Sequence, residues 1–302
     1  PDPSVKRQSG LIRPEIGDHD TLGDSIYLPY FFVISDDKDL TIKPRLFNSG
    51  VTVLQSEYRQ EGKNSLHLID ASITTGHNSY KNAGNASRSH FFANSKIDLA
   101  KENFLNSDLE INIEKTSNDT YLKLFNFIRS PLLIDKDNET LESSIKLDLG
   151  HENYDFTSSI EMYESLNGSS SSDRYYYTLP SYNYSKNFDL ENFNGTFNFN
   201  SSGNNSLSKT NVTATSINND LRFVKKDSFT FNGIKKNFEI FLRNINSVGK
   251  NNIDYKNSPQ SELISTYSYN ISLPLIKDTE NFINTLTPKL SFKVTPHDMK
   301  NK

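Results

Sequence analysis

The chain has 302 residues, of which 34% are hydrophobic and 12% aromatic, and its formal net charge is -4. The absence of cysteine excludes a disulfide scaffold, a Cys-ligated zinc site and a thiol nucleophile, and the small net charge provides no general field for nucleic acid. Twenty Phe and 15 Tyr argue against pervasive disorder, and no run approaches the ~18–20 apolar residues of a membrane helix. A polar all-β protein and a transmembrane β-barrel remain.

The first fifty residues carry prolines inside segments that otherwise favour β-strands. Pro29 lies in the segment 27–30, and Pro44 lies in the segment 42–45. Proline has no backbone N–H, so it cannot donate to a strand ladder and weakens the pairing on one side. Two neighbouring strands that each contain a proline therefore predict a seam that can open.

The connections fall into two kinds. Tight turns are expected at 35–38 and 48–50, whereas 75–87 and 165–173 are longer, polar and rich in Gly, Ser and Asn. Short turns at one end and long loops at the other are typical of outer-membrane barrels.

Apolar and polar residues alternate with period two in segments that recur from one end of the chain to the other. This pattern predicts strands with one apolar and one polar face, about a dozen of them over the chain. A soluble sandwich would show the same alternation. Aromatic residues near expected strand ends, at 91–92 and 175–177, favour the barrel slightly, because aromatic girdles flank its apolar band. The clearest alternating segments are 108–113, 145–149, 196–200, 267–273 and 290–294.

Several segments resemble one known family. The opening residues 1–11 are similar to the junction between periplasmic domain and barrel in the LPS-assembly protein LptD family, also called OstA or Imp. Residues 25–32 and 40–45 are similar to that family's first two barrel strands. Residues 117–122 and 285–290 also match, more weakly.

The resemblance implies a domain organisation and a function. Residues 1–10 would be the junction from a missing periplasmic domain, and 11–302 the N-terminal part of the barrel, roughly half of it. The protein would sit in the bacterial outer membrane and pass lipopolysaccharide sideways into the outer leaflet, with Pro29 and Pro44 at the lateral gate. Its partners would be lipopolysaccharide, outer-membrane lipids, the LptE lipoprotein plug and the periplasmic LptA bridge. An open half-barrel leaves unpaired edges, so we expect this chain not to insert stably alone.

Four basic residues near the expected gate could contact lipid phosphates, because Arg binds phosphate bidentately and Lys as a point charge. The alternative is a polar strand face that meets water. These residues are Arg13, Lys43, Arg45 and Arg59.

No catalytic motif stands out, so we expect no enzyme activity. The six His are scattered without a metal-binding spacing, and neither a metal nor a cofactor is predicted. Two alternatives remain: a soluble or surface-displayed, adhesin-like binding protein, with its apolar face buried against a second sheet, and a simple porin, with a closed barrel and no weakened seam.

Overall fold

The computed structural model describes residues 7–76, 87–133, 139–167, 173–190, 194–230, 232–279 and 282–296. Most of the two loops expected at 75–87 and 165–173, and of the junction expected at 1–10, therefore lies outside the described residues. The chain is an antiparallel all-β protein whose 18-stranded sheet is accompanied by very little helix. No register joins the first strands to the last among the described residues, so the sheet is open there and a closed barrel is not shown.

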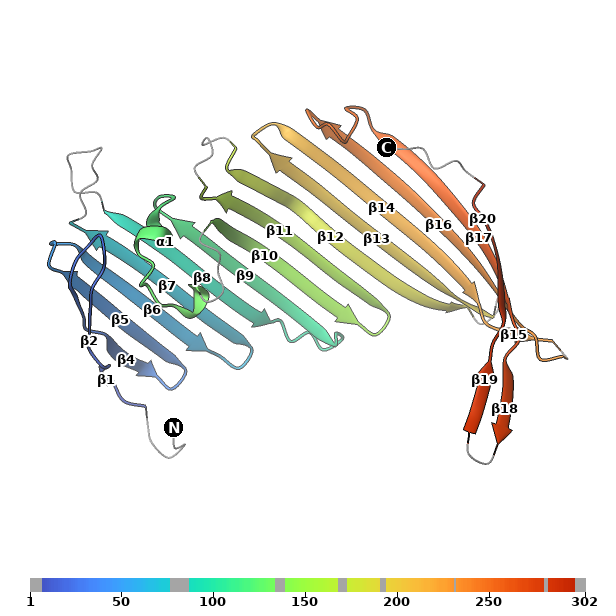
Figure 1. Ribbon diagram of the computed structural model, residues 1–302, viewed down its shortest axis with the longest axis horizontal. Helices are drawn as coiled ribbons and strands as arrows, with labels where there is room; N and C mark the ends of the chain where they lie inside the picture. Colours follow the sequence, from blue (N-terminus) through green and yellow to red (C-terminus); the bar gives the residue numbers. More distant parts are fainter. Residues whose placement is uncertain are drawn as a thin grey trace. The chain divides into compact units, whose positions relative to one another are not determined.

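The chain divides into two compact units. Unit 1 comprises Pro1–Glu102, Asn106–Leu147 and Ser159–Tyr177, and unit 2 comprises the remaining residues, mainly Thr178–Lys302. Three strands, drawn in green in Figure 1, contribute residues to both units: β10 (Thr140–His151), β11 (Tyr154–Ser165) and β12 (Tyr175–Leu190).

Unit 1 consists mainly of antiparallel strands that pair with their neighbours in the chain, and the period-two alternation predicts such strands. One α-helical turn, α1 (Tyr121–Leu124), and one 3-10 turn, η1 (Pro131–Leu133), lie against β8 (Figure 1). The strands are β1 (Gly10–Leu11), β2 (Glu15–Gly17), β3 (Ser25–Tyr27), β4 (Tyr30–Ser35), β5 (Lys38–Phe47), β6 (Thr52–Glu61), β7 (Ser65–Thr75), β8 (Arg88–Asp98) and β9 (Asn106–Thr116).

Unit 2 has longer strands, and a separate two-stranded hairpin. Each long strand pairs antiparallel with the next long strand through a continuous register. The elements are β13 (Gly195–Ser208), β14 (Val212–Lys225), β15 (Ser228–Phe229), β16 (Lys235–Lys250), β17 (Gln260–Ser272), β20 (Lys289–Val294), and the hairpin of β18 (Leu275–Thr279) and β19 (Phe282–Leu286).

The number of strands exceeds the dozen expected partly because proline interrupts the N-terminal ones. Tyr27 of β3 pairs with Arg45, and Tyr30 of β4 pairs with Ile42, so β3 and β4 form one line along β5 without a change of register. Only Leu28 and Pro29 lie between β3 and β4, which would otherwise be one longer strand.

The two faces of the unit 1 sheet differ in chemistry. Outward side chains on β4, β6, β7, β8 and β9 include Phe32, Leu54, Ile73, Phe91 and Ile113, which are 39–49% exposed. Most side chains in the intervening positions of β5–β9 are polar or charged, and many of these are buried, among them Asp39, Gln55, Glu57, Asp70 and Glu114. The buried hydrophobic residues of the described chain also lie on unit 1, in one cluster: Leu22, Phe47, Val51, Val53, Phe92, Tyr121, Leu122, Phe125, Ile128, Leu141 and Leu166.

No helix within the described ranges is long and apolar enough to cross a bilayer.

Candidate functional site

The segment 117–133 covers the polar face of β5–β8, and we call it the strap. Alternation stops at Ser117, where Ser, Asn, Asp and Thr in succession favour a turn. The helical turn α1 that follows has Thr120 at its N-terminus with no side-chain capping bond. A four-residue helix is not stable by itself, so packing against the sheet holds the strap in place.

Aromatic side chains fix the strap to the sheet. The rings of Tyr121 and Phe125 lie 5.0 Å apart and both side chains are almost fully buried. Phe127 packs edge-on against His19 at 5.6 Å, and its ring lies 5.3 Å from that of Phe47. The strap therefore contacts both the β2–β3 connection and β5.

A buried hydrogen-bond network lies beneath α1. The Asp70 carboxylate accepts bonds from Gln55 Nε2 at 3.0 Å to each oxygen, and His90 Nε2 lies 3.2 Å from Asp70 Oδ1. His90 Nδ1 lies 3.0 Å from Ser72 Oγ and 3.1 Å from Tyr121 Oη. Burial raises the pKa of Tyr121, so its hydroxyl stays protonated and can donate within this network.

The order Asp70–His90–Ser72 has the connectivity of a nucleophile activated by a base. Ser72 is 6% exposed, however, and its hydroxyl is also bonded to that of Tyr121. The Ser72 hydroxyl is therefore largely closed to solvent in this conformation. What the network does here is join the strap to β6, β7 and β8 through fully satisfied polar groups.

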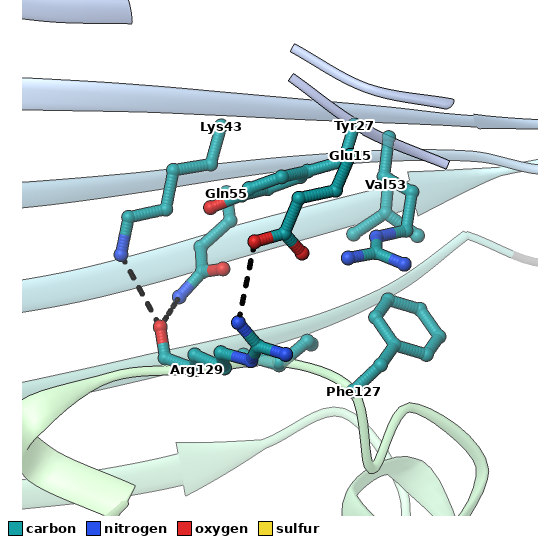
Figure 2. A pocket seen from close by; sticks show the side chains of 9 residues that line it. Glu15, Tyr27, Lys43, Val53, Gln55, Phe127 and Arg129 are labelled. Atoms are coloured by element: carbon teal, nitrogen blue, oxygen red, sulfur yellow. Dashed lines mark hydrogen bonds and ion pairs between the residues drawn. The ribbon is translucent and has the colours of Figure 1, made fainter. Parts of the chain in front are cut away.

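The strap also presents its backbone to the sheet at Arg129. The Arg129 carbonyl accepts one bond from Lys43 Nζ and one from Gln55 Nε2, each at 3.2 Å (Figure 2). The Arg129 guanidinium points the other way and lies 3.5 Å from a carboxylate oxygen of Glu15 on β2. The cavity between these groups is about 10 Å³, which is room for a single water molecule rather than a ligand.

The structure brings together three of the four predicted phosphate-binding residues on the polar face, but each is already engaged. Lys43 Nζ pairs with Glu57 at 2.6 Å, and Arg59 Nε pairs with Asp39 at 2.9 Å. The Arg45 guanidinium lies between two rings, 4.8 Å from Tyr27 and 4.7 Å from Phe127. A phosphate would have to compete with these partners.

The fourth predicted residue, Arg13, lies apart from the other three. It is exposed in the connection between β1 and β2, and no ion pair involves it among the described residues. The strand register explains its position. Leu11 pairs with Tyr30 and Glu15 pairs with Tyr27, so an advance of four residues in the edge segment matches an advance of only three residues in the facing segment. The extra residue makes a bulge near Pro14, which displaces Arg13 from the ladder.

Pro29 and Pro44 weaken two different seams. The Pro44 carbonyl accepts a bond from the Leu28 amide at 3.0 Å. In an antiparallel pair the nitrogen and the carbonyl of one residue point to the same neighbouring strand, so the Pro44 nitrogen faces the Leu28 carbonyl. Because proline has no N–H, that carbonyl receives no ladder bond from Pro44. The Pro29 carbonyl accepts from the Ile12 amide at 2.8 Å, so its missing donor faces the N-terminal edge segment 10–17. Each of the first two seams thus lacks one ladder bond.

Sequence reasoning did not identify Asp70, His90, Tyr121, Phe127 or Arg129. Asp70 and His90 sit in ordinary alternating strands, and only the strap shows that their face is covered. A weak signal existed at 117–133, where alternation fails although aromatic residues continue.

No family model and no curated protein matches this chain. Among solved structures it is similar to a bacterial polysaccharide outer membrane secretin, with 8% sequence identity over 90% of this chain and 83% of that chain, and a TM-score of 0.30. Similarity at this level carries no functional conclusion.

Proposed function

We propose that this chain is the membrane-embedded part of an outer-membrane β-barrel that passes lipopolysaccharide sideways through its N-terminal strands. The exposed apolar face of the unit 1 sheet, opposite a polar face that is partly buried, is the observation that supports a location in the membrane.

A soluble protein buries its apolar side chains and exposes its polar ones, and the unit 1 sheet shows the opposite distribution. Large apolar side chains from β4 and β6–β9 lie exposed on one face. A soluble protein rarely exposes a contiguous apolar patch above a few hundred Å². Charged side chains such as Asp39, Lys43 and Glu57 occupy the other face. A barrel wall with lipid outside and a polar lumen inside requires this pattern. The strands β5–β9 have 10 or 11 residues, close to the ~9–11 needed to cross a bilayer.

The adhesin-like alternative expects the apolar face to be buried against a second sheet. The unit 1 strands have no second sheet on that face within the described residues, and their outward Leu, Ile and Phe side chains remain exposed. This observation favours a membrane over a soluble sandwich.

The lateral route is supported by the two proline-weakened seams. A ladder bond contributes roughly 0.5–1.5 kcal/mol net in water, and its loss matters more where lipid offers no replacement. Lipopolysaccharide as the cargo is supported by the resemblance of the first fifty residues to the LptD family. The contacts of LptE and LptA are part of the same proposal.

Photo-crosslinking in living cells tests this function. A photoreactive residue replaces Tyr30, which faces outward on β4 beside Pro29 and is 37% exposed. The matched control replaces Ile113, which faces outward on β9 and is 41% exposed. We expect lipopolysaccharide adducts at Tyr30 well above those at Ile113.

Equal adducts at both positions would show a barrel merely surrounded by lipopolysaccharide, and would overturn the gate. Phospholipid adducts at both positions without lipopolysaccharide would leave the membrane location intact and overturn the cargo. An absence of any lipid adduct would overturn the membrane location itself.

A further inference from the structure

The strap touches elements on both sides of the two weakened seams. Its α1 end is fixed to β7 and β8 through Ser72 and His90, and its Arg129 carbonyl to β5 and β6 through Lys43 and Gln55. Its other contacts reach the edge of the sheet. Arg129 reaches Glu15 on β2, and Phe127 reaches His19 in the connection that follows β2.

We propose that the strap 117–133 is a latch that holds the N-terminal edge, residues 10–27, against β5. That the strap holds this edge in place follows from its contacts alone. What the latch controls, the release of lipid, rests on the proposed function. The latch is an intramolecular device: one segment of the chain bridges the two seams that Pro29 and Pro44 leave short of one bond each.

The contacts of the latch are unequal. Those of α1 to β7 and β8 are buried, and Asp70 and Tyr121 are each 0% exposed. Those to the edge are more accessible, since His19 and Phe127 are half-buried and the side chains of the Arg129–Glu15 pair are 80% and 42% accessible. Exposed ion pairs are weak, whereas a buried network is costly to break. When the edge parts, the strap therefore stays on β5–β8 and only its edge contacts are lost.

Arg45 couples the two kinds of contact. Its guanidinium stacks between Tyr27 of β3 and Phe127 of the strap, and its Nη1 donates to Ser25 Oγ at 3.3 Å. Separation of β3 from β5 would remove Tyr27 and Ser25 from Arg45 while Phe127 stays in place. Arg45 thus acts as the point where the latch meets the inner seam, rather than as a free phosphate ligand.

Hydrogen exchange tests the latch without reference to cargo. In the purified protein in detergent, Arg129→Ala removes the guanidinium contact and leaves the carbonyl bonds intact, and Phe127→Ala in addition removes the ring contacts. We expect the amides of Ile12 and Leu28, which bridge the two seams, to exchange about tenfold faster in the double variant, as loss of the Arg129–Glu15 ion pair and the Phe127–His19 ring pair implies. Exchange on β8 and β9 should not change.

Lys96→Ala is the matched control, because it removes another exposed ion pair, that of Lys96 with Glu110 at 3.6 Å, between β8 and β9. Unchanged exchange at Ile12 and Leu28 in both Arg129→Ala and the double variant would overturn the latch. Uniformly faster exchange over all of unit 1 in the double variant would indicate loss of folding, and Arg129→Ala alone would then decide.

A reversible cross-link tests what the latch controls. The native chain has no cysteine, so the pair Glu15→Cys and Arg129→Cys can be bridged selectively by a short, reducible bis-maleimide. The control pair is Lys96→Cys and Glu110→Cys. We expect bridging of the first pair alone to abolish lipopolysaccharide adducts at a Tyr30 probe, and reduction to restore them. Equal adducts with and without the bridge would overturn control by the latch, whereas absence of adducts in the unbridged protein would overturn the proposed function and leave the exchange result to stand.

Discussion

Units 1 and 2 contain the same kind of strand but are stabilised differently. In unit 1 the strap covers one face, and all the buried hydrophobic residues of the described chain belong to this unit. In unit 2, β13, β14, β16 and β17 are longer, at 13–16 residues, and their side chains are mostly half-buried or exposed on both faces. Cross-strand pairs such as Arg243–Asp220, bonded at 2.6 and 2.7 Å, take the place of a core.

This difference shows which features of the structure follow from the alternation of apolar and polar residues and which do not. Period-two patterning is enough to pair strands in a fixed register in both units. A uniquely packed, buried site arises only where a non-strand segment returns over the polar face. The candidate site therefore lies in unit 1, and unit 2 serves as the internal reference for the effect of each substitution.

The largest expected difference comes from removing a core ring. Phe125→Ala should destabilise unit 1 by about 3–5 kcal/mol, because it leaves a cavity beneath the strap. Phe223→Ala on β14, a half-buried position with no covering element, should cost less than about 1 kcal/mol. Urea unfolding of the protein in lipid vesicles measures both, and equal losses would show that the strap is not a structural core.

The buried carboxylate provides the next comparison. Asp70→Ala leaves His90 and Gln55 without their acceptor in a site closed to water, and should cost about 3 kcal/mol. Asp220→Ala breaks the more accessible pair with Arg243 and should cost under about 1 kcal/mol. The same unfolding experiment applies, and a mild Asp70→Ala phenotype would mean that water reaches the network.

The proline seam should respond in the opposite direction. Pro44→Val restores a backbone donor that faces the Leu28 carbonyl, which should add about 1 kcal/mol and slow exchange of the Leu28 amide about fivefold. Lipopolysaccharide adducts at a Tyr30 probe should fall as well. Pro274→Val, which lies between β17 and β18 outside any ladder, is the control and should change neither quantity.

The smallest effect concerns alkaline pH. Burial raises the pKa of Tyr121 above its unfolded value near 10, so the folded protein keeps a proton that the unfolded chain has lost. This contribution is complete below about pH 10 and falls as pH rises, by under about 1 kcal/mol at pH 10.5. Tyr121→Phe should flatten the fall in stability between pH 9.5 and 10.5, and an unchanged slope would show that Tyr121 ionises freely in the folded state.

The sequence predicted the class of fold from particular residues. Leu109, Ile111 and Ile113 alternate as expected on β9, and Tyr175–Tyr177 lie at the start of β12 as expected for aromatics near strand ends. Pro44 falls in β5, and Pro29 lies between β3 and β4. The expectation that they weaken one shared seam needed correction, because their missing donors face opposite sides of the β3–β4 line.

The candidate site was less accessible to sequence reasoning. The sequence offers Lys43, Arg45 and Arg59 either as phosphate ligands or as part of a polar strand face that meets water. The structure gives each a partner: Glu57 for Lys43, the Tyr27 and Phe127 rings for Arg45, and Asp39 for Arg59. These partners lie across strands or on the strap, at separations of up to 86 residues, as for Lys43 and Arg129. No local pattern specifies contacts over that distance.

By itself the sequence determined that strands form, that each has an apolar and a polar face, and where prolines deprive the ladder of donors. These properties depend on backbone geometry and on side chains two residues apart. Only the tertiary structure decided which polar face is covered, which charges are neutralised and which seam each proline weakens. Those outcomes depend on strand register and on the path of segment 117–133 over the sheet, which bring together residues remote in sequence.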